Sequence, residues 1–161
     1  MAITVRPGNA GDMQAALPLM LGRLRERASL NPALSGLKDD AEKRFRQWLG
    51  PAMEDPRHAL FVAEDDGEMV GCLVALVEKD LPIYEVEEYA AVRMLWAAPG
   101  PGGRDVAGRL LAHAARHYEK LGVRQVRVAL APGREDEHRA AEKAGLRAAA
   151  VTYVSEPAAA R

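Results

Sequence analysis

The order of apolar patterns along the chain predicts an α/β (α+β) fold, with one mixed, mostly antiparallel sheet of about six strands flanked by helices. Two alternating segments flank an Asp-Asp-Gly turn, which is typical of a β-hairpin. A glycine-rich turn joins an apolar strand to an amphipathic helix. The 161 residues, 48% of them hydrophobic, suffice for one core and not comfortably for two. We therefore expect a single domain in the order β-α-α-β-β-β-α-β-α-β.

Six segments have the alternating or continuously apolar pattern of strands. They are residues 3–6, 59–63, 69–77, 89–97, 126–130 and 148–154. Segment 69–77 is apolar at nearly every position, so we expect its hairpin across the turn at 65–67 to lie at the centre of the sheet. In segment 89–97, Arg93 is expected to point away from the apolar face. That face is formed by Ala90, Val92, Met94 and Trp96.

Four helices are expected: three have apolar residues at helical spacing, and the fourth, residues 135–144, is short and polar. The first helix follows Asp12, the second follows Asp39 or Asp40, the third follows the glycine-rich turn, and the fourth follows Arg134. Asp12 is expected to cap the first helix, in which Pro18 can cause a kink or a restart. Glycines, in one case with a proline, are expected to end the other three helices. These ends are Gly50 with Pro51, Gly122 and Gly145.

Composition excludes several classes of function. The chain has 22 Lys and Arg against 23 Asp and Glu, so it offers no general field for nucleic acid or an anionic membrane. Without a long apolar run or a secretory signal pattern, it is expected to be cytoplasmic. The single cysteine, Cys72, is expected to be buried. His113 and His117 form an i, i+4 pair with no third ligand, so no metal site is expected.

The stretch 95–111 is a candidate phosphate site. Glycines let the backbone approach an anion, and the free N–H groups and positive dipole end of the following helix attract it. The alternative is that the glycines only end a strand.

The element order and this turn resemble the GCN5-related N-acetyltransferase (GNAT) superfamily over nearly the whole chain. Pro99 and the pair Leu110-Leu111 align the family's cofactor loop with residues 102–107, without an insertion. The resemblance implies a domain over residues 1–155 and a short tail over 156–161. It implies transfer of an acetyl or other acyl group from acetyl-CoA, in a ternary complex, to a primary amine of a small molecule, peptide or protein. No metal is implied.

The resemblance also assigns cofactor contacts. The pantetheine arm is expected along the strand, and the pyrophosphate at the loop and the helix start. The residues concerned are Leu95, Trp96, Ala97, Gly102, Gly103, Arg104, Val106, Ala107 and Gly108. Arg104 falls where the family often has Lys or Arg and can donate a charge-assisted hydrogen bond to a phosphate. The N–H of Ala97 or a neighbour is the expected oxyanion donor.

Four residues depart from the family's pattern, one of them Leu146 in place of a Phe. Gly102 replaces Arg or Gln, Asp105 replaces a central Gly, and Ala141 replaces a Tyr that protonates the CoA thiolate. Asp105 either repels the pyrophosphate by about 4 kcal/mol at close range or turns outward and caps the helix. These departures leave a second hypothesis open, in which an inactive domain of the same fold senses CoA or binds another protein.

Acyl transfer to an amine needs a base and often an acid. Glu87 and Glu88 are the candidate bases, with Glu78 as a further carboxylate, and Tyr153 or His138 is the candidate acid. Each can equally be a solvated or structural group.

The resemblance places the acceptor at the first two helices and their loop, residues 17–49. There Lys38, with Arg23, Arg25, Arg27 and Glu26, either recognises a carboxylate-bearing acceptor or belongs to an ordinary solvated surface, so no acceptor is predicted. After residue 154 the sequence given is too short for the family's seventh strand. We therefore expect a sheet edge that is either shortened or completed by a strand from a partner chain. A homodimer is the default expectation.

Overall fold

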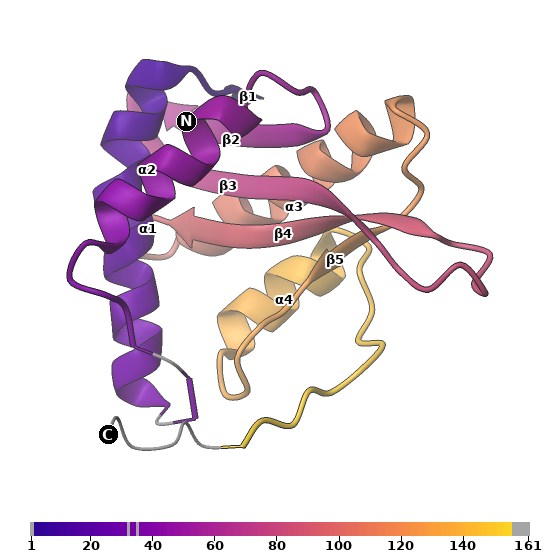
Figure 1. The fold of residues 1–161 in the computed structure, drawn as a ribbon. Coiled ribbons are helices and arrows are strands. Elements are labelled where there is room, and N and C mark those ends of the chain that lie inside the picture. Colours follow the sequence, from indigo (N-terminus) through magenta and orange to yellow (C-terminus); the bar gives the residue numbers. More distant parts are fainter. Residues whose placement is uncertain (1, 32, 35, 156–161) are drawn as a thin grey trace.

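The computed structural model describes residues 2–31, 33–34 and 36–155, except for the side chain of Arg104. The described chain forms one five-stranded sheet with helices on both faces (Figure 1). The elements are β1 (Thr4–Pro7), α1 (Ala10–Leu30), α2 (Ala41–Ala52), β2 (His58–Asp65), β3 (Glu68–Lys79), β4 (Glu88–Ala97), α3 (Gly103–Lys120), β5 (Val126–Val128) and α4 (Glu135–Lys143). The expected fold class is confirmed, with five strands instead of about six.

The strands lie in the order β1-β2-β3-β4-β5. All neighbours are antiparallel except β4 and β5, which are parallel. The β2–β3 hairpin turns at Asp66 and Gly67, whose φ angles of 50° and 82° suit a two-residue primed turn. The predicted hairpin and its place at the centre of the sheet are thus confirmed.

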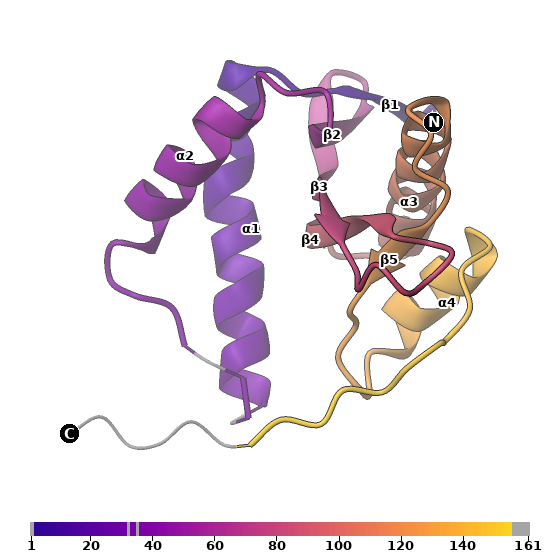
Figure 2. The same cartoon turned by 45° about the vertical axis from the view of Figure 1, so that its right-hand side comes forward.

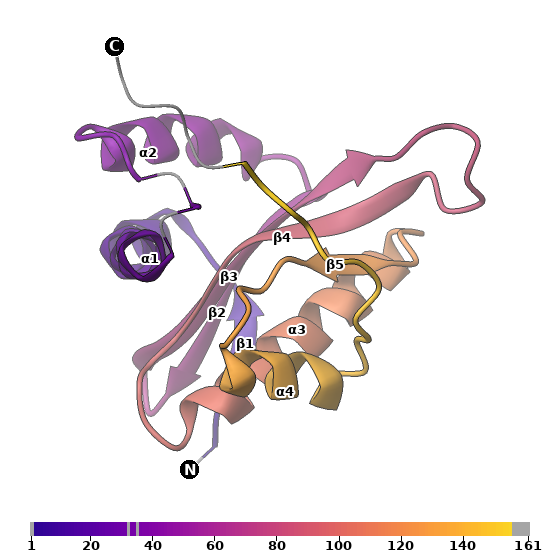
Figure 3. The same cartoon turned by 90° about the horizontal axis from the view of Figure 1, so that it is seen from below.

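Helices α1 and α2 lie on one face of the sheet, and α3 and α4 lie on the other (Figures 2 and 3). Each face has its own apolar cluster. One cluster joins α3 to Phe61 and Leu73, and the other joins α1 to Val62 and Cys72. Cys72 is fully buried as expected, and burial raises the pKa of its thiol to about 12.

A β-bulge at Arg93 changes the faces of β4. Val74 pairs with Met94 while the next residue of β3, Ala75, pairs with Val92, so Arg93 is an extra residue in β4. Ala90 and Val92 therefore pack on the α3 side, whereas Met94 and Trp96 pack on the α1 side. The prediction that these four residues share one face is wrong, because strict alternation does not hold across a bulge.

Helix α1 begins three residues earlier than expected. Asn9 is the N-cap, and Asn9 and Asp12 exchange side-chain and backbone hydrogen bonds of 2.8 and 3.0 Å in a capping box. Asp12 is thus the third helical residue, not the cap. The helix runs through Pro18 without interruption. Helix α2 also continues past Gly50 and Pro51, because a proline in the last turn removes only one helical hydrogen bond.

The expected last strand does not form. Residues 146–155 contain no helix or strand, and Val151, Tyr153 and Val154 are exposed. Three consecutive alanines, Ala148–Ala150, supply little apolar surface to hold this segment on the sheet. The predicted tail, residues 156–161, lies outside the described part of the chain. No helix within that part is long and apolar enough to cross a membrane.

Candidate functional site

The second half of β4 has a free edge. Strand β5 pairs only with residues 90–92, while β4 continues to Ala97 (Figure 1). Ala98 donates its N–H to Val70 of β3 at 2.8 Å. Because successive N–H groups of a strand point to opposite sides, those of Leu95 and Ala97 point away from β3, toward the free edge. The predicted pantetheine segment therefore offers backbone donors and acceptors to an extended ligand.

This edge leads directly to the start of α3. Gly102 is the N-cap of α3, and no side chain caps this end in the described structure. The first N–H groups of a helix have no partner within the helix, and the helix dipole places partial positive charge beside them. An uncapped helix start after a glycine-rich turn is suited to an anion such as a diphosphate.

Two glycines allow this junction to form. A Cβ on Gly103 would clash with the carbonyl oxygen of Ala98. A Cβ on Gly71 would clash with Val106 and lie 3.1 Å from the backbone oxygen of Trp96. Glycine at both positions therefore lets the helix start lie close to β4 and lets α3 pack tightly on β3.

Asp105 does not cap α3. Its carboxylate accepts a 2.8 Å hydrogen bond from Arg109 and lies 3.7 Å from Lys143 of α4. The hydrogen bond from Arg109 lowers the pKa of the Asp105 carboxyl, so this group stays ionised. The cationic side chains of Arg109 and Lys143 thus partly neutralise the negative charge of Asp105. The sequence did not indicate Lys143, because helix α4 joins α3 only through the tertiary fold.

The predicted loop residues fall into two groups. At the start of α3 Gly102 is exposed and Gly103 is half-buried, whereas Val106 and Ala107 are buried. The N–H of Val106 is already bonded to Gly102 at 3.2 Å. Gly108 lies one turn further along the helix, near the backbone of Ala140. All of these cofactor assignments stay predictions, and so does that of Arg104, whose side chain is outside the described structure.

The structure places the candidate bases at the opposite end of β4. Glu88 begins the strand, and Arg57 binds its carboxylate at 2.7 Å. Glu87 is exposed just before it. Leu95 lies seven residue steps along the strand from Glu88, which corresponds to roughly 20 Å. Glu78 accepts a 3.0 Å hydrogen bond from Tyr89 and pairs with Arg93. None of these carboxylates is brought to the free edge, and the base stays a prediction.

The two candidate acids lie in the C-terminal segment and in α4. Tyr153 is 92% exposed in the irregular C-terminal segment. Nε2 of His138 lies 2.9 Å from the carbonyl oxygen of Ala131, so this side chain stabilises the turn that precedes α4. Ala141, which stands where the family has Tyr, is buried in the cluster under α3. The acid therefore also stays a prediction.

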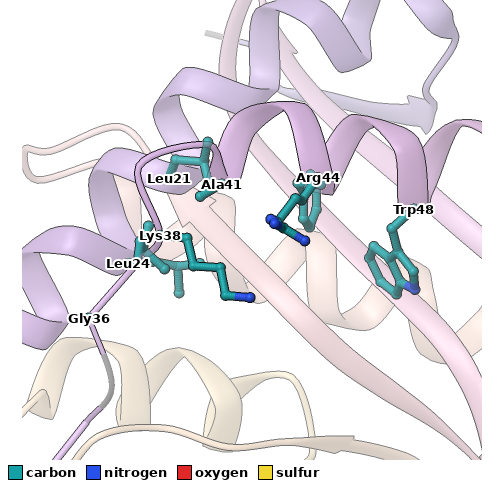
Figure 4. A pocket seen from close by; sticks show the side chains of 9 residues that line it. Leu21, Leu24, Gly36, Lys38, Ala41, Arg44 and Trp48 are labelled. Carbon is teal, nitrogen blue, oxygen red and sulfur yellow. The ribbon is translucent and has the colours of Figure 1, made fainter. Parts of the chain in front are cut away.

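A pocket that the sequence did not indicate lies between α1 and α2 (Figure 4). It has a volume of about 360 Å³. Its walls come from both helices and from the segment between them, and they comprise Leu21, Leu24, Gly36, Leu37, Lys38, Ala41, Arg44, Phe45 and Trp48. Its sequence signals are the i, i+3 spacing of Phe45 and Trp48 on one helix side and the cationic Lys38 in the segment before them. Across the described residues, no three His, Cys, Asp or Glu side chains gather as a metal site.

Comparison with known proteins agrees with this architecture. A family model described as the acetyltransferase (GNAT) family matches residues 23–146. No curated protein matches the sequence. Among solved structures, the chain resembles glucosamine-6-phosphate N-acetyltransferase from Arabidopsis thaliana with a TM-score of 0.67 and 14% identity, covering 96% of this chain and 98% of that one.

Two further structures were determined with the coenzyme. A predicted acetyltransferase from Clostridium acetobutylicum, with acetyl-CoA, has a TM-score of 0.65 and 12% identity over 92% of each chain. The aminoglycoside N-acetyltransferase AAC(6')-Iy, in complex with CoA, has a TM-score of 0.71 and 18% identity over 98% of this chain and 95% of that chain. At these identities the likeness shows the fold, and the family model spans most of the sequence. The chain therefore belongs to the acetyltransferase (GNAT) family.

Proposed function

We propose that the protein transfers an acetyl group from acetyl-CoA to a primary amine, by direct attack within a ternary complex. One observation carries the proposal: the free edge of β4 ends at the uncapped start of α3. An extended arm and the diphosphate at its end can thus bind to one continuous stretch of backbone.

Each part of the coenzyme has a matching feature. The pantetheine amides can pair with the outward N–H groups of Leu95 and Ala97, as a further strand would. In the first turn of α3 the N–H of Gly103 is bonded to Gly100 at 3.1 Å, so the diphosphate can accept hydrogen bonds from the next two N–H groups. Arg109 and Lys143 offset the negative charge of Asp105 in the same region. The solved relatives with acetyl-CoA or CoA support this coenzyme.

In the proposed reaction the amine nitrogen attacks the thioester carbonyl carbon. A C–N bond forms, the C–S bond breaks, and CoA leaves as a thiolate. An outward N–H of β4, such as that of Ala97, stabilises the oxyanion as charge develops on the carbonyl oxygen. The amine gives up one proton, and the thiolate takes up one. In this proposal the amine's proton passes to water, because Glu87 and Glu88, the bases that the sequence suggested, lie at the other end of β4. Tyr153 remains the proposed donor to the thiolate.

The test is thermal unfolding with and without acetyl-CoA. Ligand at about a hundred times its Kd stabilises the folded state by ~2.7 kcal/mol, which raises Tm. Arg104→Ala is expected to weaken the shift, and Arg116→Ala, an exposed arginine further along α3, serves as the control. An unchanged Tm up to millimolar acetyl-CoA would sink the proposal. Thiol release with a panel of amines then tests the transfer itself.

A further inference from the structure

We propose that the pocket between α1 and α2 binds the acceptor, and that this acceptor joins its amine to an aromatic or similarly sized apolar group and a carboxylate. This inference rests on the proposed function and specifies the substrate class. An aromatic amino acid such as phenylalanine has all three features.

The size and walls of the pocket favour an apolar group of ring size. Its volume of about 360 Å³ is near the lower end for small-molecule sites. Aliphatic side chains of Leu21, Leu24 and Leu37 face two aromatic rings. The rings of Phe45 and Trp48 lie 5.4 Å apart, and Trp48 is 45% exposed. A bound ring would cover this exposed apolar surface and stack against aromatic faces.

The charges at the pocket favour an anion. Lys38 and Arg44 both extend toward the same opening, with Trp48 beyond them (Figure 4). None of the nine lining residues is acidic. Arg44 forms an ion pair of 2.8 Å with Asp40, whereas Lys38 forms no ion pair in the described chain and acts on the Asp40 carboxylate only from a longer distance. A ligand carboxylate can pair with Lys38, while a polycationic amine would meet the positive charge of this lysine.

The pocket adjoins the face of β4 that leads to the free edge. Leu24 and Phe45 pack against the same apolar cluster as Met94 and Trp96 of β4. The pocket itself is lined by the two helices and the segment between them, so these apolar contacts are its link to the strand that is proposed to hold the thioester. Positive charges beside the amine also favour its neutral form, which is the form that attacks.

Binding can be measured through Trp48 without any catalysis. The chain has two tryptophans, so Trp96→Phe leaves Trp48 as the only one. We expect L-phenylalanine to change Trp48 fluorescence in a saturable way. Phenethylamine, which lacks the carboxylate, and spermidine, which is a polycation, are expected to bind at least about tenfold more weakly. Equal or tighter binding of either probe overturns the inference.

Two lysine variants distinguish binding in this pocket from a general effect of positive surface charge. Lys38→Ala is expected to weaken L-phenylalanine binding about tenfold, as loss of a charged hydrogen bond does. Lys43→Ala removes an exposed lysine of α2 that does not line this pocket, and it is expected to leave binding unchanged. Equal effects of the two variants would contradict the assignment.

Acetyl transfer distinguishes this inference from the proposed function. If acetyl-CoA raises Tm and spermidine is acetylated while L-phenylalanine is not, the substrate class is wrong and the activity stands. If L-phenylalanine binds at Trp48 and acetyl-CoA has no effect on Tm, the ligand class is supported and the proposed function is wrong. Acetylation of L-phenylalanine that depends on Lys38 supports both.

Discussion

Asp105 is the third residue of α3, and its carboxylate is shared by Arg109 and Lys143. Asp105→Asn removes a negative charge beside the proposed diphosphate site while keeping the size of the side chain. We expect acetyl-CoA to bind several-fold tighter, more so at low salt, because a like charge is removed. Tm without ligand is expected to fall slightly, because an acidic group at a helix start interacts with the dipole by about 0.3–1 kcal/mol. Calorimetric titration at two salt concentrations measures the affinity.

Glu119→Gln is the matched control for that experiment. It removes one carboxylate from the same helix, near the other end, so it changes net charge equally. Its acetyl-CoA affinity should match that of the unchanged protein. Tighter binding in both variants would mean that net charge alone acts.

Glu88 tests the predicted base. Its carboxylate is held by Arg57 and lies roughly 20 Å along β4 from Leu95. From this placement we expect Glu88→Gln to change kcat less than about threefold, since general-base catalysis contributes about a hundredfold or more. The pH profile of kcat is the decisive readout. A hundredfold loss together with a lost acidic limb would establish Glu88 as the base after all.

At the scale of elements, the packing of α3 on β3 depends on Gly71. Gly71→Ala adds a methyl group that would clash with Val106 and approach the backbone of Trp96. We expect a loss of about 1–3 kcal/mol of unfolding free energy and weaker acetyl-CoA binding, because the helix start moves away from β4. Urea unfolding and ligand titration measure the two effects.

Gly50→Ala is the control for that substitution. Gly50 lies in α2, and a Cβ there meets nothing within 4 Å. Alanine is favoured over glycine in a helix by up to about 1 kcal/mol, so this variant should be slightly more stable. Equal destabilisation by both variants would refute the packing argument.

The start of α1 predicts a pH dependence of stability. Arg6 donates hydrogen bonds of 2.7 and 3.0 Å to Asp12, and these lower the pKa of the Asp12 carboxyl in the folded state. A lowered folded-state pKa stabilises the fold above the ordinary carboxyl pKa of about 4, and this stabilisation is lost as pH falls through the lowered value. Asp12→Asn is expected to cost about 1–2 kcal/mol near neutral pH.

The unfolding free energy of the Asp12→Asn variant should therefore approach that of the unchanged protein as pH falls below about 4. Chemical unfolding over a pH series measures this. A difference that stays constant into strong acid would contradict the ion-pair assignment. Asp39→Asn, at an exposed carboxylate before α2, should show little effect at any pH.

The sequence predicted those features that depend on local patterns. The hairpin turn at Asp66 and Gly67 and the turn at Gly100 before α3 have positive φ angles that few residues other than glycine adopt. The bulge at Arg93 was missed, because an inserted residue leaves no mark on an apolar run. The pair Asp105–Lys143 was missed, because it joins two helices that meet only in the folded chain. The pocket beside Lys38 was missed for the same reason.

At the scale of the whole molecule, the C-terminal segment contributes little to the fold. Val151, Tyr153 and Val154 are 75%, 92% and 53% exposed. A chain that ends at Arg147 is therefore expected to keep its unfolding free energy within about 0.5 kcal/mol, as exposed positions usually do. Thermal unfolding and light scattering of the shortened chain measure stability and oligomeric state. A loss of several kcal/mol, or of a dimer, would show that this segment completes a sheet across two chains, as the sequence allowed.

The free edge of β4 has a consequence for solubility. Between Arg93 and Ala97 the strand exposes backbone groups without a neighbouring strand in the described chain, and such a row can pair with a strand from another molecule. A coenzyme lying along that row would occupy the same groups. The proposed cosubstrate would then also act as a cover against self-association, so aggregation during storage or heating would depend on how much coenzyme the protein carries.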